Sequence, residues 1–189
     1  GVHIPPKNYL KEARKICDKH GVLMVFDEVI TAFGRTGKRF CMEHYDCYPD
    51  FISLSKGLTS GYLPLSATGI SSKIWKEIEN KIPPGLIFAN ALTTSNHAAS
   101  CAVALANIEI IETEKLVKNS EQQGKYLLNQ LKAKFKKNWM VKEIRGLGLM
   151  AGINWKNNRD APENYMGRKK ILANKVFANE FSMNFVSEC

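Results

Sequence analysis

The chain has 189 residues, of which 44% are hydrophobic and 24% charged, a composition that suits one globular domain or part of a larger one. Its formal net charge is +9, yet the lysines are dispersed and no basic motif is interleaved with aromatic residues, so we expect no nucleic-acid partner. The five cysteines are irregularly spaced and form no Cys-x-x-Cys pair, which disfavours a disulfide framework or a zinc site and favours a reducing compartment.

Membrane and metal binding are also disfavoured by the sequence. No apolar run is long enough to cross a membrane, no signal peptide is visible, and the histidines have no spacing that suits a metal. The chain opens at Gly1 without a methionine, so we expect part of a longer protein. We expect a cytoplasmic location, and an organellar one stays open because a targeting segment could precede Gly1.

The first predicted elements are a helix and a buried strand. Residues 8–20 carry apolar side chains at helical spacing, with Asn8 as the N-cap and Gly21 as the residue that ends the helix. The apolar run 22–26 then predicts a fully buried strand of the kind found in parallel sheets. This run ends in two carboxylates, the first being Asp27, and ligands of open α/β sheets bind outside the carboxyl ends of such strands.

A glycine-rich loop follows the first strand. Residues 30–37 include Gly34, Arg35 and Gly37, a combination that can approach an anion or a partner chain closely. An ordinary loop with a solvated arginine is the alternative. Residues 40–48 then predict a short helix.

The second predicted strand, 51–54, leads directly to Lys56, which opens a loop rich in glycine and hydroxyl residues. A further strand at 63–70 and a helix at 73–79, capped by Ser72, complete this part of the chain.

The second half of the chain is mainly helical. Small apolar side chains over 97–112 predict a helix packed deep between other elements, and 113–135 predicts a second, amphipathic helix. Residues 141–153 predict a strand, a glycine bend and a second strand. The remaining predictions are a polar loop at 154–167, a helix at 168–181 and the start of a strand at 184–187.

Asp27 and Lys56 are the candidate site residues, since each lies at the end of a short apolar run. A simple ion pair between them is one alternative. A nucleophilic amine combined with an acid that keeps a ring nitrogen protonated is the arrangement used with pyridoxal phosphate, and the hydroxyl of Thr93 suits its phosphate. A Ser-Lys nucleophile pair built from Ser55 or Ser60 is a further alternative.

Two segments resemble the signature motifs of one enzyme family. Residues 27–37 read DEVITAFGRTG and resemble the signature segment of class III (omega) aminotransferases, which are fold type I pyridoxal phosphate enzymes. Residues 55–65 read SKGLTSGYLPL and resemble that family's cofactor-lysine segment. Both motifs are long and occur in the family's order, and the resemblance extends over nearly the whole chain.

The resemblance implies an α/β fold. The chain would form the central part of a fold type I transferase, with a mostly parallel sheet flanked by helices, plus the start of a small α+β C-terminal domain. By the same resemblance, residues 1–112 are part of the large cofactor-binding domain, 113–140 form a connecting helix, and 141–189 begin the small domain.

The resemblance also implies roles for four residues. Asp27 would pair with the pyridine nitrogen of pyridoxal 5'-phosphate, and Val29 would pack on one face of the ring. Lys56 would hold the cofactor covalently and act as the catalytic acid and base. Thr93 would bind the cofactor phosphate; in this family that threonine comes from the partner subunit, which implies a homodimer with shared sites.

The implied activity is transfer of an amino group from an amine or omega-amino acid donor to a keto acid such as pyruvate. The substrate could be an omega-amino acid, a diamine or the keto intermediate of biotin synthesis, and the sequence leaves that choice open. Two alternatives remain. One is an aminomutase of the same fold, which would need the same Lys56 and Asp27, and the other is a truncated or degenerate paralogue without catalysis.

Several positions depart from the family pattern. Ala32 stands where the family usually has glycine, so a methyl group there is either tolerated or strains the loop. The loop around Asn90 and Asn96 also differs, and Glu188 lies where many members carry the arginine that receives the substrate carboxylate. These departures favour the non-catalytic alternative.

Overall fold

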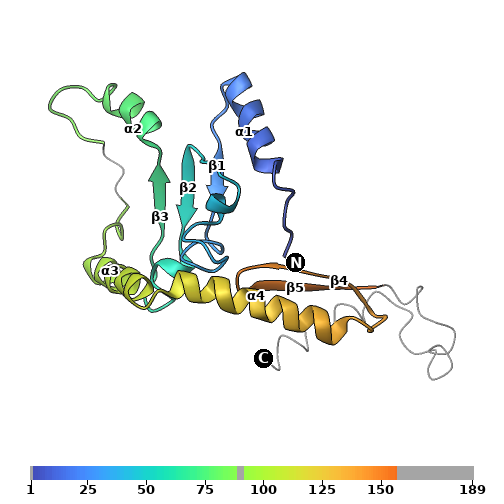
Figure 1. Cartoon of the computed structure of the whole chain (residues 1–189). Helices are drawn as coiled ribbons and strands as arrows, with labels where there is room; N and C mark the ends of the chain where they lie inside the picture. Colours follow the sequence, from blue (N-terminus) through green and yellow to red (C-terminus); the bar gives the residue numbers. More distant parts are fainter. Residues whose placement is uncertain (1, 89–91, 157–189) are drawn as a thin grey trace, which may run out of the picture.

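The computed structural model describes residues 2–88 and 92–156, which form two β-sheets with helices around them (Figure 1). The elements predicted at 168–181 and 184–187, and Glu188, lie outside the described residues. A three-stranded sheet lies beside helix α1, Tyr9–His20, and the long helix α4, Leu116–Phe135, runs beside a two-stranded hairpin (Figure 1). Within the described ranges, no helix combines the length and apolar character needed to cross a membrane.

Helix α1, Tyr9–His20, confirms the first predicted helix. Asn8 occupies the N-cap position, although its side chain makes no capping hydrogen bond. Gly21 ends the helix with a φ of 64°, a left-handed conformation that glycine adopts without a steric penalty.

A small apolar core lies beneath α1 and is formed by Met24, Tyr45 and Cys47. Partly buried apolar side chains pack against it: Leu10, Ala13, Cys17, Phe26 and Cys41. The helix predicted at 40–48 is only a short 3₁₀ turn, η1, at Cys41–His44. The turn cannot extend into a longer helix because Asp46, two residues after its end, has a positive φ of 46°, a left-handed conformation that a right-handed helix does not permit.

The main sheet has the strand order β1-β2-β3, formed by Val25–Asp27, Phe51–Leu54 and Ala67–Ile70. β1 and β2 pair in parallel, whereas β2 and β3 pair antiparallel. The connection from β2 to β3 contains the 3₁₀ turn η2, Lys56–Leu58, and no crossover α-helix, which suits an antiparallel return. The described sheet is therefore mixed, where the resemblance implied a mostly parallel one.

The strand predicted at 22–26 is shorter and more exposed than its apolar run indicated. Only the segment from Val25 pairs with a neighbour, and Val22 and Val25 are 55% and 60% exposed. β1 is the outer strand of the described sheet, so its free edge meets no neighbouring strand there. The prediction of a strand is confirmed, and the prediction that it is fully buried is wrong for this chain.

Helices α2, Ser72–Glu79, and α3, Ala98–Thr113, confirm two further predictions. The cap of α2 is Ser71 rather than the predicted Ser72, because the Ser71 hydroxyl accepts a hydrogen bond from the backbone N–H of Ile74 (3.4 Å).

Helix α3 does not pack as deeply as its small apolar side chains indicated. Only Ser100 and Ala104 on it are buried, and Leu105 is 70% exposed. The helix packs against η2 and α4, and its exposed side chains lie on the surface of the described part of the chain (Figure 1). The prediction of a helix packed between other elements is therefore wrong for this chain.

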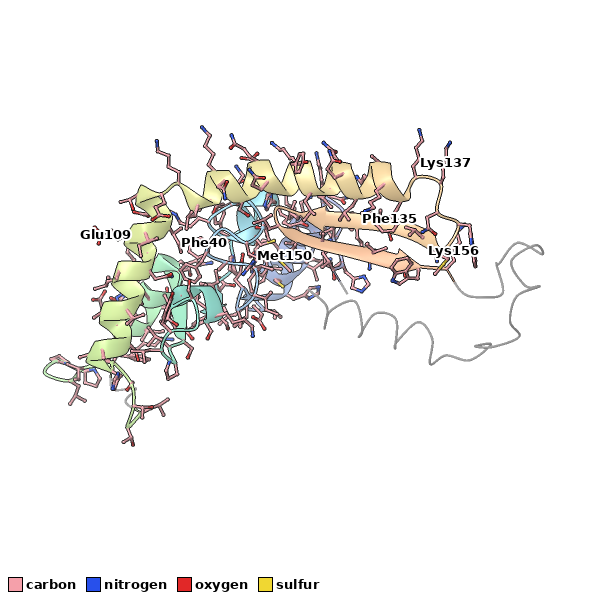
Figure 2. All side chains as sticks on the ribbon, turned by 90° about the horizontal axis from the view of Figure 1, so that it is seen from below. Phe40, Glu109, Phe135, Lys137, Met150 and Lys156 are labelled. Carbon is pink, nitrogen blue, oxygen red and sulfur yellow. The ribbon has the colours of Figure 1, made fainter. Side chains whose placement is uncertain are left out.

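Helix α4, Leu116–Phe135, packs along the antiparallel hairpin of β4, Val141–Leu147, and β5, Met150–Trp155 (Figures 1 and 2). The predicted amphipathic helix and the predicted strand, bend and strand are thus confirmed. Figure 2 shows Phe135 between the helix and the hairpin, where its ring meets that of Trp155 edge to face with centroids 6.3 Å apart.

The domain division predicted at residues 112 and 140 stays a prediction. α4 and the hairpin occupy the stretches expected for the connecting helix and for the start of the small domain. The polar loop predicted at 154–167 is wrong at its start, because Asn154 and Trp155 continue β5 opposite Glu143 and Val141, and residues 157–167 lie outside the described residues.

Three segments meet at a junction that leaves no room for side chains: the loop 34–37, helix α4 and the β4–β5 turn. A Cβ on Gly148 would overlap the backbone of Thr36, and a Cβ on Gly124 would overlap the carbonyl of Gly148. A backbone N–H of the hairpin turn also donates to the carbonyl of Arg35 (3.1 Å). The glycine-rich loop therefore lies against this chain's own helix, and the Arg35 side chain is exposed.

We expect Gly148→Ala to destabilise the chain more than Gly21→Ala does. Both glycines have similar positive φ values, 56° for Gly148 and 64° for Gly21, so the conformational cost of adding a Cβ is similar at the two positions. A Cβ on Gly21 meets nothing within 4 Å, whereas one on Gly148 meets backbone atoms. Urea denaturation should show an additional loss of about 1–3 kcal/mol for Gly148→Ala. Equal losses would show that the junction is loosely packed.

Asp50 joins the start of β2 to β1 and α1. Its Oδ2 accepts hydrogen bonds from the backbone N–H of Met24 (2.7 Å) and from the Arg14 guanidinium (2.7 Å). The bond from Met24, and to a smaller extent Arg14, hold the pKa of the Asp50 carboxyl below its ordinary value, although burial opposes the shift.

We expect Asp50→Asn to lower the free energy of unfolding at neutral pH by about 1–3 kcal/mol, because it removes one of the two carboxylates that pair with Arg14, leaving only Asp18, and weakens the acceptor of the Met24 N–H. The folded-state pKa of Asp50 is depressed, so its contribution is complete above the unfolded pKa of about 3.9 and disappears as the pH falls through the folded value. Urea denaturation of the unaltered chain and of Asp50→Asn, at neutral pH and at a pH below the folded-state pKa of Asp50, tests the prediction. A difference in stability that is the same at every pH would contradict it.

Candidate active site

The two residues predicted to carry the chemistry lie at one edge of the sheet. Asp27 ends β1 and Lys56 follows β2, and these strands are parallel with Asp27 opposite Ser53, so their carboxyl ends meet. The Asp27 Oδ1 accepts a hydrogen bond from the backbone N–H of Val29 (2.9 Å). The side chains of Asp27 and Lys56 are exposed and that of Val29 is half-buried. No ion pair joins Asp27 to Lys56 in the described part of the chain, so the simple ion-pair alternative loses support.

Lys56 opens η2 with a φ of 28°, a conformation that is uncommon for a residue with a Cβ. Two hydroxyls flank it. The Ser55 Oγ donates to the carbonyl of Leu65 (2.9 Å) and the Thr59 Oγ1 donates to the carbonyl of Leu63 (2.7 Å). These hydrogen bonds tie η2 to the segment that leads into β3, so Ser55 serves the backbone rather than a Ser-Lys nucleophile pair.

The loop after β1 packs against η2. A Cβ placed on Gly57 would lie 2.9 Å from the Cβ of Phe33, so only glycine fits beside Lys56 without a shift. Phe33 itself has a φ of 59°, and its N–H donates to the carbonyl of Arg39 (2.7 Å). The two sequence motifs are therefore in direct contact, which fixes the lysine turn relative to the end of β1.

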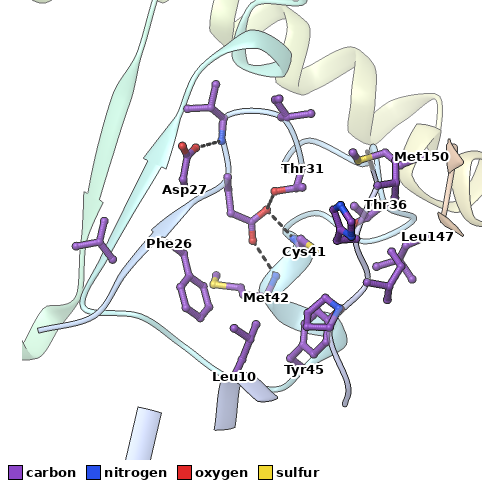
Figure 3. Close-up of a pocket in the computed structure, with 18 residues that line it drawn as sticks. Leu10, Phe26, Asp27, Thr31, Thr36, Cys41, Met42, Tyr45, Leu147 and Met150 are labelled. Atoms are coloured by element: carbon purple, nitrogen blue, oxygen red, sulfur yellow. Dashed lines mark hydrogen bonds between the residues drawn. The ribbon is translucent and has the colours of Figure 1, made fainter. Parts of the chain in front are cut away.

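Glu28 is a buried anchor next to Asp27, with only 3% of its surface exposed. Its carboxylate accepts hydrogen bonds from the Thr31 hydroxyl (2.7 Å) and from the backbone N–H groups of Cys41 (2.8 Å) and Met42 (2.7 Å) (Figure 3). The Glu28 N–H donates to the carbonyl of Ser53 (3.0 Å). One residue thus joins β1, β2, the motif loop and η1.

In the sequence, Glu28 is only the second of two carboxylates that end an apolar run. The one signal for a structural role is that this acid directly follows an apolar strand, where its carboxylate can be buried. A buried carboxylate needs several hydrogen-bond donors. Nothing in the local spacing indicated that these donors come from η1, 13 and 14 residues later.

A cavity of about 590 Å³ opens between β1, α1, η1 and the hairpin (Figure 3). Its walls are mainly apolar. Asp27 and Val29 contribute to the lining, whereas Lys56 and Thr93 do not. The lysine therefore belongs to the exposed edge of the sheet rather than to this cavity.

The Cys41 thiol also lines the cavity but is unsuited to nucleophilic chemistry. Burial, and next the charge of Glu28, raise the pKa of this thiol to about 11, so it stays protonated at neutral pH. The described residues contain no group of three or more His, Cys, Asp or Glu side chains placed to hold a metal ion.

Thr93 lies in an exposed turn ahead of α3. The turn is closed by its own hydrogen bonds, in which the Leu92 N–H donates to the Ser95 hydroxyl (3.0 Å) and that hydroxyl donates to the Leu92 carbonyl (2.7 Å). No hydrogen bond among the described residues links Thr93 to Asp27 or Lys56. The structure thus places Asp27 and Lys56 at adjacent strand ends, Val29 beside Asp27, and Thr93 in the exposed turn ahead of α3. The assignment of all four residues to one site stays a prediction.

Ala32 fits its position without strain. Its φ is not positive, the residue is 4% exposed, and its N–H donates to the carbonyl of Glu28 (3.1 Å). A methyl group is therefore accommodated where the family usually has glycine, which removes one argument for the non-catalytic alternative.

This geometry agrees with the comparisons with known proteins. The family model described as aminotransferase class-III matches residues 1–182, and the chain belongs to that family. It is 39% identical to the adenosylmethionine-8-amino-7-oxononanoate aminotransferase of Anoxybacillus flavithermus over 87% of this chain and 36% of that protein. It is 38% identical to the taurine–pyruvate aminotransferase of Bilophila wadsworthia over 86% of this chain and 36% of that protein.

Solved structures agree with the fold. A transaminase from the marine bacterium Virgibacillus superposes with a TM-score of 0.77 at 42% identity, over 82% of this chain and 34% of that one. The α/β, fold type I architecture implied by the resemblance is thus confirmed. The chain spans about a third of the length of the relatives it matches.

We expect Glu28→Gln to lower the free energy of unfolding by about 1–3 kcal/mol, because one amide cannot accept from both the Cys41 and Met42 N–H groups and the Thr31 hydroxyl in the same geometry. Urea denaturation measures the loss, and amide hydrogen exchange at Cys41 and Met42 should become faster.

Glu43→Gln is the matched control for this prediction. Glu43 lies in η1 and accepts one exposed hydrogen bond, from the backbone N–H of Phe40 (2.6 Å). Its replacement should change stability by no more than about 0.5 kcal/mol. Equal effects of the two substitutions would show that Glu28 is not the anchor of this region.

Proposed function

We propose that this chain carries the cofactor-binding centre of a pyridoxal 5'-phosphate-dependent aminotransferase. The observation that carries the proposal is the placement of Asp27 and Lys56 at the carboxyl ends of two adjacent parallel strands, within the two motifs of the family. Families with this chemistry need a lysine and an acid at one site, and this edge of the sheet supplies both.

The residues present fit this cofactor. A lysine amine reacts with an aldehyde, a carboxylate holds a protonated ring nitrogen, and an aliphatic side chain packs on a ring face. Lys56, Asp27 and Val29 offer these three groups along one edge. When bound, pyridoxal phosphate supplies an electron sink that stabilises negative charge on the substrate carbon.

The chain's own residues then have distinct tasks. The Asp27 Oδ1 accepts from the Val29 N–H, which orients the carboxylate and leaves the other oxygen for a protonated ring nitrogen. The Lys56 Nζ stands at the end of a flexible stem and can take a proton from a substrate carbon as a base and return it as an acid. Glu28 and the contact between Gly57 and Phe33 hold the two backbones that carry these groups.

We propose an amine or omega-amino acid as the donor and a pyruvate-like keto acid as the acceptor. The relative named taurine–pyruvate aminotransferase supports this donor class and this acceptor class, because its name pairs an omega-amino compound with pyruvate. An aminomutase would use the same Lys56 and Asp27 but would need no separate keto acid, so dependence of turnover on added pyruvate distinguishes the two activities.

A homodimer in the cytoplasm completes the proposal. Large apolar side chains before and on α3 are exposed in this chain: Leu86, Ile87, Phe88, Leu92 and Leu105. Exposed apolar surface of this kind favours a subunit interface, and the exposed Thr93 in the same region could then reach a partner's cofactor. The free cysteines support a reducing compartment.

We expect pyridoxal phosphate added to the purified chain to attach to Lys56. Borohydride reduction followed by peptide mass mapping should place the label on that lysine, and Lys56→Ala should abolish the label there while Lys81→Ala leaves it in place. Lys81 is an exposed lysine on the segment after α2 and serves as the matched control. Label spread evenly over the surface lysines would contradict the proposal for this chain and support the non-catalytic alternative.

A further inference from the structure

A side chain on α3 holds the turn that follows Lys56. The Asn107 Nδ2 donates hydrogen bonds to the carbonyls of Gly57 (2.8 Å) and Leu58 (3.1 Å). Its Oδ1 accepts a hydrogen bond from the Ser60 hydroxyl (2.6 Å). One amide therefore makes three contacts with the residues immediately after the lysine, although it lies 50 residues further along the chain.

The turn needs such support because its backbone is strained. Lys56 and Ser60 have φ values of 28° and 51°, in a region that residues with a Cβ avoid. Such conformations persist only where surrounding contacts determine them. Phe33 blocks the turn on one side through its contact with Gly57, and Asn107 binds it from α3.

The chemistry of the contact requires an amide. Two carbonyl oxygens need donors and one hydroxyl needs an acceptor, and among similarly sized side chains only asparagine offers both. Aspartate would bring a negative charge towards two carbonyl oxygens, and leucine would offer no polar partner. Asn107 is half-buried in a helix otherwise composed largely of small apolar residues, where asparagine is a poor helix former.

We propose that Asn107 is the positioning residue of Lys56: it fixes the strained turn so that the lysine amine is presented at the edge beside Asp27. The proposal rests on the role of Lys56 in the proposed function. The side-chain hydrogen bonds of Asn107 go to the turn after Lys56, so Asn107 acts through the backbone of η2.

Four substitutions test the proposal in the full chain. Asn107→Leu removes all three hydrogen bonds, Asn107→Asp keeps only the acceptor, and Ser60→Ala removes a single bond. Asn119→Leu is the matched control, because Asn119 is an exposed asparagine on α4. Circular dichroism shows whether each variant is folded.

The first measurement is the fraction of Lys56 that carries pyridoxal phosphate after borohydride reduction, at a cofactor concentration below saturation. We expect Asn107→Leu and Asn107→Asp to lower this fraction about tenfold and Ser60→Ala to lower it about twofold, with Asn119→Leu unchanged. An unchanged fraction in a folded Asn107→Leu variant would overturn the proposal.

The second measurement needs no cofactor and separates this proposal from the proposed function. Trace acetylation with acetic anhydride, mapped by mass spectrometry, gives the reactivity of Lys56 relative to Lys81. Releasing the turn should change this ratio by about twofold or more in Asn107→Leu and not in Asn119→Leu.

If the unaltered chain takes up no cofactor at Lys56, the proposed function fails for this chain, and the acetylation ratio alone decides whether Asn107 positions the lysine. If Asn107→Leu does not fold, Ser60→Ala decides by the same ratio. A ratio that is constant across the folded variants would overturn the proposal.

Discussion

The arrangement of the site depends on one buried carboxylate. Glu28 accepts hydrogen bonds from the Thr31 hydroxyl and from two backbone N–H groups of η1, while its own backbone bonds to Ser53 on β2. A carboxylate that is 3% exposed is costly unless it is fully hydrogen-bonded, so these partners must stay in place together. Glu28 thereby fixes the end of β1, from which Asp27 and Val29 project.

Close backbone contacts extend this constraint to the rest of the chain. The loop after β1 reaches η2 through Phe33 and Gly57, and it reaches the hairpin through Thr36 and Gly148. It reaches α4 through Gly37, where a Cβ would lie 3.0 Å from the Cα of Glu121. Each contact tolerates only glycine at the point of approach. The same motif that supplies the acid therefore connects the main sheet to the helix and hairpin that follow it.

The described part of the chain also exposes an unpaired strand edge and apolar side chains. Among the described residues β1 has one free edge, and α3 exposes large apolar side chains such as Leu105. The relatives that the chain matches are about three times its length. The lysine turn, in contrast, is held by contacts among the described residues, with Phe33 and Asn107 on two sides and hydrogen bonds from Ser55 and Thr59.

The sequence by itself determined the helices α1 to α4, the hairpin, the two motifs and the candidates Asp27 and Lys56, because periodicity, caps and motif spacing are local properties. It did not determine how deeply β1 and α3 are buried, because burial depends on which elements become neighbours. The tertiary structure alone showed that Glu28 binds η1 and that Asn107 binds the lysine turn, contacts that span 13 and 50 residues. Hydrogen bonds between distant segments leave no periodic signal in a single sequence, so only the folded chain could reveal them.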